Sequence, residues 1–387
     1  MNREIYSSRL VFYAALYYWG IQPILYWGKL LGFIPSIPFT LILYILPVLS
    51  TQFLFSKHTI AKYNIITIIV FFLAILYILF DIIVLSNSKE SLIRNAGVLA
   101  YNILAFICGV FFPREKVGKY RKLINIIWAI SSVFWLLNAD IGGSWTLVVP
   151  SNEEFNYLLI SDGYVILSLL TLSVNVSRNN IFSTLLPLFS IVVLFVINSR
   201  SALFIFILTF AFCFLPRMSK KNKISFIIAI LLAIICLLNI INLDTLLDTR
   251  VLRLILNTEH DTSLMARTEI LNTEKDYLWN NWIFGDYDGY LKRGGDGAYI
   301  HNYLSFWEQY GLMPFVCFCV LSILSIRVCI NIKSSTSEEI ILAIAILFYT
   351  LSGCVISKGY VYSTIWFSFG YLYNLSLSHN SISTRQT

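Results

Sequence analysis

Charged residues are scarce in this sequence. Only 13% of the 387 residues are Asp, Glu, Lys or Arg, whereas 58% are hydrophobic. A soluble domain carries about 25% charged residues, so this composition excludes an ordinary water-soluble enzyme. At roughly 20 apolar residues for each bilayer crossing, it predicts about twelve spanning helices and leaves little chain for a separate globular domain.

Spacings typical of metal sites and disulfides are also missing. The seven cysteines lie inside apolar runs, with no Cys-x-x-Cys pair and no nearby His. They are therefore interpreted as small membrane-buried side chains, and no metal is expected. There is no internal repeat and no low-complexity tract. Met1 to Arg9 is basic but leads into a run too long for a cleaved signal peptide, which predicts the start of the first helix.

The apolar runs have the lengths that a bilayer requires. They fall at about residues 10 to 28, 33 to 55, 64 to 86, 92 to 112, 121 to 138, 157 to 177, 181 to 198, 200 to 216, 224 to 242, 311 to 332, 338 to 357 and 360 to 377. Pro23 and Pro47 lie inside runs and predict kinks, which membrane helices tolerate. We therefore predict an all-α polytopic membrane protein in which residues 1–387 form a single integral membrane domain.

The distribution of Lys and Arg predicts the orientation, because short cytoplasmic loops collect positive charge. With the N-terminus inside, the cytoplasmic side receives Arg3, Arg9, Lys57, Lys62, Arg114, Lys116, Lys119, Arg121, Lys122, Arg178, Arg217, Lys220, Lys221, Lys223, Arg327, Lys333 and Arg385. Both termini are then cytoplasmic. The net charge of +7 therefore reflects topology and does not indicate nucleic-acid binding.

Two outer loops follow from this orientation. The smaller, residues 139–156, is acidic. The same orientation places Asp162 on the outer side. The larger, residues 243–298, is far longer than the two to eight residues that join bundled helices. It holds ten acidic and six basic residues together with Trp279 and Trp282. A disordered linker is the alternative, but the aromatics and the apolar stretch at 251–256 favour a structured, functional loop.

Three cationic or titratable residues stand out on the outer side. Arg200 lies between two apolar runs with almost no loop, where it either snorkels to the interface or binds an anion through its bidentate fork. Arg267 lies in a stretch with helical periodicity and is either a phosphate ligand or a salt-bridge partner of Glu269 or Glu274. His301 follows a glycine-rich turn where the loop re-enters the membrane, and is either structural or a proton acceptor.

Taken together, these residues suit one kind of chemistry. Two arginines would offset the charge that develops on a diphosphate leaving group, and a histidine would orient or deprotonate a hydroxyl acceptor. That combination predicts glycosyl transfer from a lipid-linked sugar. Glu308, Asn302 and Glu269 are secondary candidates, with Glu308 seven positions after His301.

At these residues the sequence resembles the O-antigen polymerase and O-antigen ligase superfamily, which includes Wzy-type polysaccharide polymerases. The resemblance covers about residues 180 to 330. It rests on Ser199-Arg200-Ser201-Ala202, Ala266-Arg267, Trp282-Ile283-Phe284-Gly285, His301-Asn302-Tyr303-Leu304 and Tyr310-Gly311-Leu312-Met313-Pro314. The acidic loop between Asp140 and Asp162 lacks the arginine motif that such polymerases carry, which speaks against a mechanism with two substrate-binding loops.

The resemblance implies a GT-C-like glycosyltransferase in the bacterial inner membrane. It would join undecaprenyl-diphosphate-linked repeat units on the periplasmic face with inversion, without a cofactor, metal or nucleotide donor. Arg200 and Arg267 would hold the donor diphosphate, and His301 would activate the acceptor hydroxyl. Its partners would be lipid-linked donor and acceptor glycans, membrane lipid and a chain-length regulator protein, and nucleic acid is not expected.

Three alternatives stay open. An O-antigen ligase would transfer the glycan to lipid A-core by the same chemistry, although the segment Tyr303-Leu304-Ser305-Phe306-Trp307 favours the polymerase. A flippase or secondary transporter would need an ionisable site near the midplane, for which Asp81 is the candidate. Asp286-Tyr287-Asp288 resembles a divalent-cation motif, but the adjacent glycines favour a turn.

Overall fold

The computed structural model describes residues 2–30, 62–85, 89–113, 117–140, 146–148, 157–176, 178, 181–240, 262–295, 297–332 and 337–383. Over these residues the fold is helical, apart from turns and one isolated bridge between Ala139 and Leu147. The predicted span at 33 to 55, most of the acidic loop at 139–156 and the first part of the loop at 243–298 lie outside the described residues.

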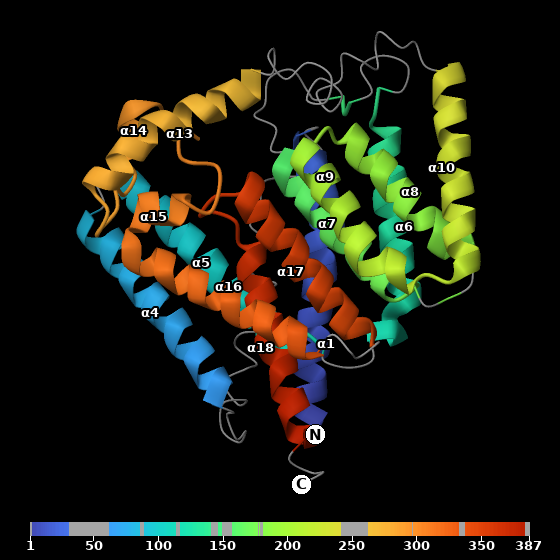
Figure 1. Cartoon of the computed structure of the whole chain (residues 1–387), viewed down its shortest axis with the longest axis horizontal. Helices are drawn as coiled ribbons and strands as arrows, with labels where there is room; N and C mark the ends of the chain where they lie inside the picture. Colours follow the sequence, from blue (N-terminus) through green and yellow to red (C-terminus); the bar gives the residue numbers. More distant parts are fainter. Residues whose placement is uncertain are drawn as a thin grey trace.

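The described helices are shown in Figure 1, in which the colours follow the sequence. The N-terminal part comprises α1 (Asn2–Leu16), η1 (Tyr17–Ile21), α2 (Gln22–Leu30), α4 (Lys62–Leu85), α5 (Lys89–Phe111), η3 (Val117–Tyr120) and α6 (Arg121–Leu137). The middle comprises α7 (Tyr157–Ser173), α8 (Ile181–Val196), α9 (Arg200–Thr209), η4 (Phe210–Phe214), η5 (Leu215–Arg217) and α10 (Lys220–Ile240). The C-terminal part comprises α13 (Thr262–Asn280), α14 (Gly289–Arg293), α15 (Ser305–Tyr310), α16 (Leu312–Ile332), α17 (Glu338–Ile356) and α18 (Thr364–Ser383).

The apolar runs identified in the sequence coincide with these helices wherever the structure describes them. Five described segments are long and apolar enough to cross a membrane. They are Ile66–Val84, Val117–Leu137, Arg200–Arg217, Leu312–Ile332 and Glu338–Ile356. The structure is therefore consistent with an α-helical membrane protein, and the total of about twelve spans stays a prediction.

The first run contains the irregularity that Pro23 predicts. A proline inside a helix removes one backbone hydrogen bond and crowds the preceding turn. Here the turn just before Pro23 is a π-helix, η1, in which the backbone N–H of Gln22 donates to the carbonyl of Tyr17. The widened turn directs Tyr18 and Trp19 toward α5 and α18, where they line a cavity.

The core is organised by close contact between α5 and α18. A methyl group at Gly109 would lie 2.2 Å from the carbonyl oxygen of Phe367, and one at Gly370 would lie 2.1 Å from that of Phe106. The two helices approach this closely because each presents a glycine to the backbone of the other, as small residues allow in membrane bundles. Phe106, Phe112 and Tyr371 fill the adjoining space.

Filling this contact should destabilise the bundle. We expect Gly370→Leu to lower the thermal unfolding midpoint in detergent, with a loss of about 1–3 kcal/mol or more, because α18 must move away from α5. Gly97→Leu is the matched control on α5, since no atom lies within 4 Å of a methyl group at that position. Equal midpoints for the two variants would contradict the described packing.

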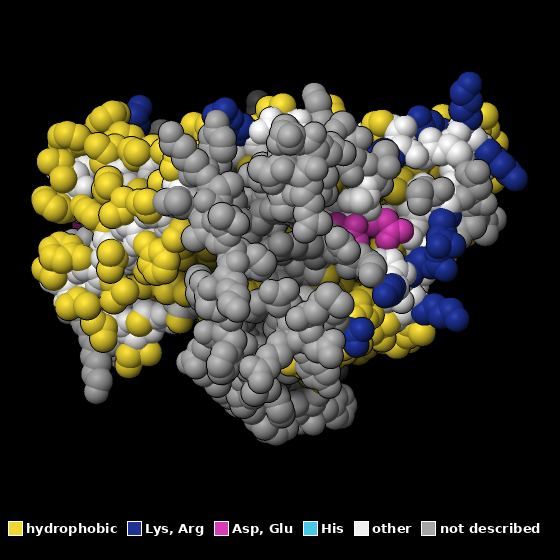
Figure 2. All heavy atoms as spheres, turned by 90° about the horizontal axis from the view of Figure 1, so that it is seen from below, with side chains coloured by type: hydrophobic (Ala, Val, Ile, Leu, Met, Phe, Trp, Pro, Cys, Tyr) yellow, Lys and Arg dark blue, Asp and Glu magenta, His cyan; other side chains and the backbone are white. Residues whose placement is uncertain are grey.

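The two ends of the bundle differ in character. The start of α1 and the end of α18 lie at one end, and α13 and α14 lie at the other (Figure 1). Viewed from the end with the termini, Lys and Arg side chains gather on the side of α6, α8 and α10, and hydrophobic side chains cover the side of α4 (Figure 2). Exposed cations here include Lys122, Arg178, Lys220 and Lys221. Residues that the sequence assigns to one side of the membrane thus share one end of the molecule.

Candidate functional site

The candidate site lies where α13, the link from α14 to α15 and the link from α17 to α18 meet. Arg267 is in the second turn of α13, and His301 is in the link that leads to α15. The charge of Arg267 acts on the imidazole of His301, so the structure brings together two residues that are 34 positions apart in the sequence (301 minus 267). The predicted helix around Arg267 is confirmed by α13.

His301 lies against one member of a cluster of tyrosine rings. The centroid of the Tyr299 ring lies 4.8 Å from that of the imidazole. Tyr299 in turn contacts Tyr290 of α14 and Tyr360 of the α17–α18 link, with centroid distances of 5.4 and 5.2 Å. The hydroxyls of Tyr290 and Tyr360 are 3.1 Å apart. Three separate segments therefore hold the ring that covers His301, which fixes the position of the imidazole.

The surroundings favour the neutral form of His301. Burial lowers the pKa of its imidazole below the ordinary value, the cation of Arg267 lowers it further, and a hydrogen bond with the backbone of Gly297 opposes these effects. Both lowering causes disfavour a positive charge on the ring. At neutral pH the imidazole is therefore unprotonated and able to accept a proton.

Glu308 of α15 is fully buried. Its Oε2 atom accepts a hydrogen bond of 2.8 Å from the backbone N–H of Ile300, the residue before His301, and its Oε1 atom has no described partner. Burial raises the pKa of the Glu308 carboxyl to about 8, helped by the nearby Glu274 and opposed by the Ile300 N–H and by Arg293. Glu308 thus supports the segment that carries His301, and at neutral pH it holds its proton.

The pKa of Glu308 makes stability depend on pH. Because its pKa is raised from 4.5 to about 8, the folded protein binds this proton more tightly than the unfolded chain does. The resulting stabilisation is complete below the ordinary value and is lost as the pH rises through the folded value. Glu308→Gln keeps the acceptor for Ile300 but cannot ionise. Between about pH 5 and pH 9 we expect the unfolding midpoint of wild type to fall by several degrees relative to this variant.

The control for this measurement is Glu269→Gln, which changes an exposed carboxyl on α13. That variant should follow wild type across the same pH range. Parallel curves for wild type and Glu308→Gln would show that Glu308 does not retain its proton in the fold.

Arg293 links α13 to α14. Its Nε atom donates to Glu274 Oε1 over 2.9 Å, and its Nη1 atom pairs with Asp286. The guanidinium carbon also lies 3.9 Å from the centroid of the Tyr277 ring. One alternative for Arg267 was a salt bridge with Glu269 or Glu274; in the structure Glu274 is paired with Arg293. This pairing forms because the chain turns back after α13 and brings α14 alongside it.

The Asp286-Tyr287-Asp288 segment forms a turn, as the neighbouring glycines predict. Its two carboxylates have different partners, because Asp286 pairs with Arg293 and Asp288 accepts a hydrogen bond of 2.7 Å from Asn95 of α5. Asp288 has a left-handed backbone, with φ of 56°, a conformation that Asp tolerates. The two acidic side chains therefore stabilise the packing of this turn, Asp286 against Arg293 of α14 and Asp288 against Asn95 of α5.

The secondary candidates have distinct positions. Asn302 follows His301, and its Oδ1 atom accepts a hydrogen bond of 2.9 Å from the backbone N–H of Leu304, so it shapes the turn before α15. Glu269 is exposed on α13, two residues after Arg267. Asn302 thus holds the backbone near His301, whereas Glu269 faces the outside of α13.

Two of the motifs that carry the family resemblance pack against each other. The backbone N–H of Leu312 donates to the carbonyl of Trp282 over 3.1 Å. Gly285 and Gly311 face each other here with φ of 75° and 78°, and a methyl group at Gly311 would lie 2.1 Å from the carbonyl oxygen of Ile283. Only glycine fits this positive-φ contact without strain. The contact fixes the end of α13 to the start of α16.

Arg200 occupies the first position of α9, as the sequence predicts for a residue that opens a helix. The helix begins at the end of the bundle where α13 lies (Figure 1). It packs against α7, α8 and α17, whereas α13 packs against α15. The helix that carries Arg200 therefore contacts α17, which leads into the link that carries Tyr360, and it is α15 that α13 contacts.

A buried ion pair inside the bundle was missed in the sequence. Lys358 Nζ lies 2.7 Å from Asp162 Oδ2, and the hydroxyl of Tyr349 donates to Asp162 Oδ1 over 2.7 Å. The two charged side chains are 5% and 14% exposed. Asp162 was assigned to the acidic outer loop, but it lies in α7. The bundle therefore contains ionisable groups besides the earlier candidate, Asp81. Asp81 lies on α4, and the structure does not describe its side chain.

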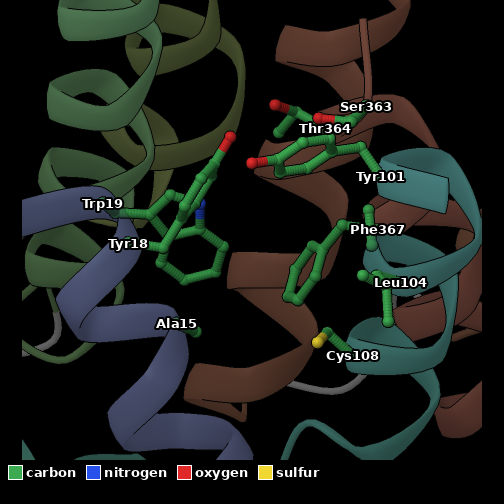
Figure 3. Close-up of a pocket in the computed structure, with 10 residues that line it drawn as sticks. Ala15, Tyr18, Trp19, Tyr101, Leu104, Cys108, Ser363, Thr364 and Phe367 are labelled. Carbon is green, nitrogen blue, oxygen red and sulfur yellow. The ribbon is translucent and has the colours of Figure 1, made fainter. Parts of the chain in front are cut away.

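A small cavity lies beside this pair, between η1, α5 and α18 (Figure 3). Its volume of about 20 Å³ accommodates one or two water molecules. The hydroxyl groups of Tyr18, Tyr101, Ser363 and Thr364 gather at one end, and Cys108 and Phe367 line the other. The polar end adjoins the start of α18.

The chain matches no known family profile and no curated protein.

Proposed function

We propose that the protein is a polysaccharide polymerase of the O-antigen type, a glycosyltransferase that joins undecaprenyl-diphosphate-linked repeat units. In this proposal it lies in the bacterial inner membrane with both termini cytoplasmic, and the end that carries α13 and α14 is periplasmic. The observation that carries the proposal is that Arg267 lies near enough to His301 for its charge to lower the pKa of the imidazole, which favours the neutral ring. A fixed cation next to a proton acceptor suits a reaction with an anionic leaving group and a hydroxyl nucleophile.

The proposed reaction is a single displacement. His301 accepts the proton of the acceptor hydroxyl while the hydroxyl oxygen forms a bond to the anomeric carbon of the donor. The bond between that carbon and the diphosphate oxygen breaks, and the electron pair leaves with undecaprenyl diphosphate. Arg267 and Arg200 bind the phosphates and offset the developing charge. The configuration at the anomeric carbon inverts, and the proton then passes from His301 to water.

The same chemistry fits an O-antigen ligase, and a genetic experiment separates the two. Deleting the gene in a strain that makes long glycan chains should remove the ladder of chain lengths and leave a single repeat unit on lipid A-core. Loss of every repeat unit from the core would assign the ligase instead. Lipopolysaccharide profiles on gels, with the gene restored from a plasmid as the control, distinguish the outcomes.

A transporter or flippase is the second candidate, and the Lys358–Asp162 pair favours it. Ionisable groups buried in a membrane bundle often mark a transport pathway. A transporter would move lipid-linked units across proteoliposomes and leave their length unchanged. If the protein forms longer glycans without nucleotide sugar and without an ion gradient, transport alone does not account for its activity.

A further inference from the structure

The Lys358–Asp162 pair lies where the α17–α18 link joins the bundle core. Asp162 is held from two sides, by Lys358 Nζ at 2.7 Å and by the Tyr349 hydroxyl at 2.7 Å. The ammonium of Lys358 also lies 5.4 Å from the centroid of the Tyr362 ring. Separating the two members of a buried ion pair leaves each with an uncompensated charge, which costs free energy, so the two side chains stay together. The pair therefore fixes the start of the link to α7.

The residue after Lys358 touches the ring that covers His301. A methyl group at Gly359 would lie 2.5 Å from Tyr299 Cε2 and 3.2 Å from Ser305 Oγ. The link backbone thus lies directly against Tyr299 and the start of α15. The next residue, Tyr360, contacts Tyr299 from another direction, with a centroid distance of 5.2 Å.

The far end of the link is also fixed. Ser363 and Thr364 lie beside the hydroxyl groups of Tyr18 and Tyr101 at the polar end of the cavity (Figure 3). The backbone N–H of Trp366 donates to the carbonyl of Ser363 over 3.0 Å, which starts α18. Because the end of the link is held here, the position of the link against Tyr299 depends on the start of the link, where Lys358 binds Asp162.

We propose that the Lys358–Asp162 ion pair positions the α17–α18 link, and through it the Tyr299 ring, so that His301 is held covered and oriented at the candidate site. Both members are positioning residues, since they act on His301 through Gly359, Tyr360 and Tyr299. The role of this arrangement in catalysis rests on the proposed function, whereas the positioning of Tyr299 over His301 does not depend on that function.

The test measures how fast diethyl pyrocarbonate modifies His301 in the full-length protein in lipid nanodiscs, resolved by peptide mass spectrometry. Because the Tyr299 ring covers the imidazole, Lys358→Met and Asp162→Asn should each raise the rate by about tenfold, as the link moves away from a broken pair. Lys358→Arg retains the cation and should stay close to wild type. Glu339→Gln is the matched control, since that buried carboxylate binds the backbone of Val117.

The double variant Asp162→Asn/Lys358→Met covers the case in which a single variant fails to fold. It leaves no unpaired charge in the bundle and should fold, yet it lacks the tether, so His301 should again react faster. Unfolding midpoints identify the folded variants. Unchanged modification of His301 in folded Lys358→Met, or in the folded double variant, overturns the proposal.

Glycan synthesis by the same variants is a separate readout. If the pair positions His301, turnover falls in Lys358→Met while the KM for the lipid-linked donor changes little, and Lys358→Arg restores turnover. If wild type makes no polymer but the variants expose His301, the positioning holds and the proposed function fails. If wild type makes polymer and His301 is equally protected in all folded variants, the positioning fails and the function stands.

Discussion

Replacing His301 with Gln should lower the rate of glycan elongation by about 10²–10⁴-fold, the contribution of a positioned general base. Glutamine retains hydrogen-bonding atoms but cannot take a proton from the acceptor hydroxyl. The measurement is single-turnover elongation of a lipid-linked repeat unit by purified protein in nanodiscs. We expect donor binding to be retained, because the phosphate ligands are the arginines.

Tyr303→Phe is the control for His301→Gln, because Tyr303 is an exposed neighbour two positions further along the same link. It should elongate glycan at nearly the wild-type rate. Full activity of a folded His301→Gln variant would remove His301 from the mechanism and leave Arg267 without its proposed partner.

Replacing Arg267 with Gln should lower elongation by about 10²–10³-fold, the range found when one donor to a developing negative charge is removed. Arg267→Lys should recover only part of the activity, because an ammonium cannot form the bidentate contact of a guanidinium with phosphate. Lys292→Gln on α14 is the matched control: it removes an exposed cation near the site and should have little effect.

The Arg267 variant also makes a prediction about pH. Arg267 lowers the pKa of His301, so its removal should raise that pKa toward the ordinary value. The acid limb of the elongation rate, where protonation inactivates His301, should move to higher pH in Arg267→Gln. The same shift should appear in the pH dependence of His301 modification. An unmoved acid limb would show that the two residues are not electrostatically coupled.

Hydropathy was sufficient to locate the described helices other than α13, α14 and α15, because each apolar run long enough for a bilayer must satisfy its backbone hydrogen bonds within itself. It also located the break before Pro23 and the start of α9 at Arg200. The residues that open or interrupt a helix act on their own turn, so their effect is visible in the sequence.

Tertiary partners could not be predicted in the same way. Lys358 and Asp162 are 196 positions apart, and each lies at the edge of an apolar run where a charged residue ordinarily faces the interface. The partner of Glu274 could not be predicted for the same reason, since its pairing with Arg293 depends on how α14 returns along α13. The position of Glu308, seven residues after His301, likewise does not reveal that its Oε2 atom accepts a hydrogen bond from the backbone N–H of Ile300.

No sequence pattern places Arg267 near His301. Their proximity was predicted only from the proposed reaction, because a diphosphate donor and a hydroxyl acceptor require both residue types. The Tyr299 ring beside the histidine, and the Tyr290 and Tyr360 rings that contact Tyr299, belong to no motif in the sequence. They come from three different segments and become a cluster only when α14 and the α17–α18 link meet.

The most direct test of the proposed function is elongation of a defined undecaprenyl-diphosphate-linked repeat unit by the purified protein in nanodiscs, without nucleotide sugar and without an ion gradient. We predict a ladder of longer lipid-linked glycans with wild type and only the starting unit with His301→Gln. A folded wild-type protein that leaves the repeat unit unextended, or equal ladders from both proteins, would contradict the proposal.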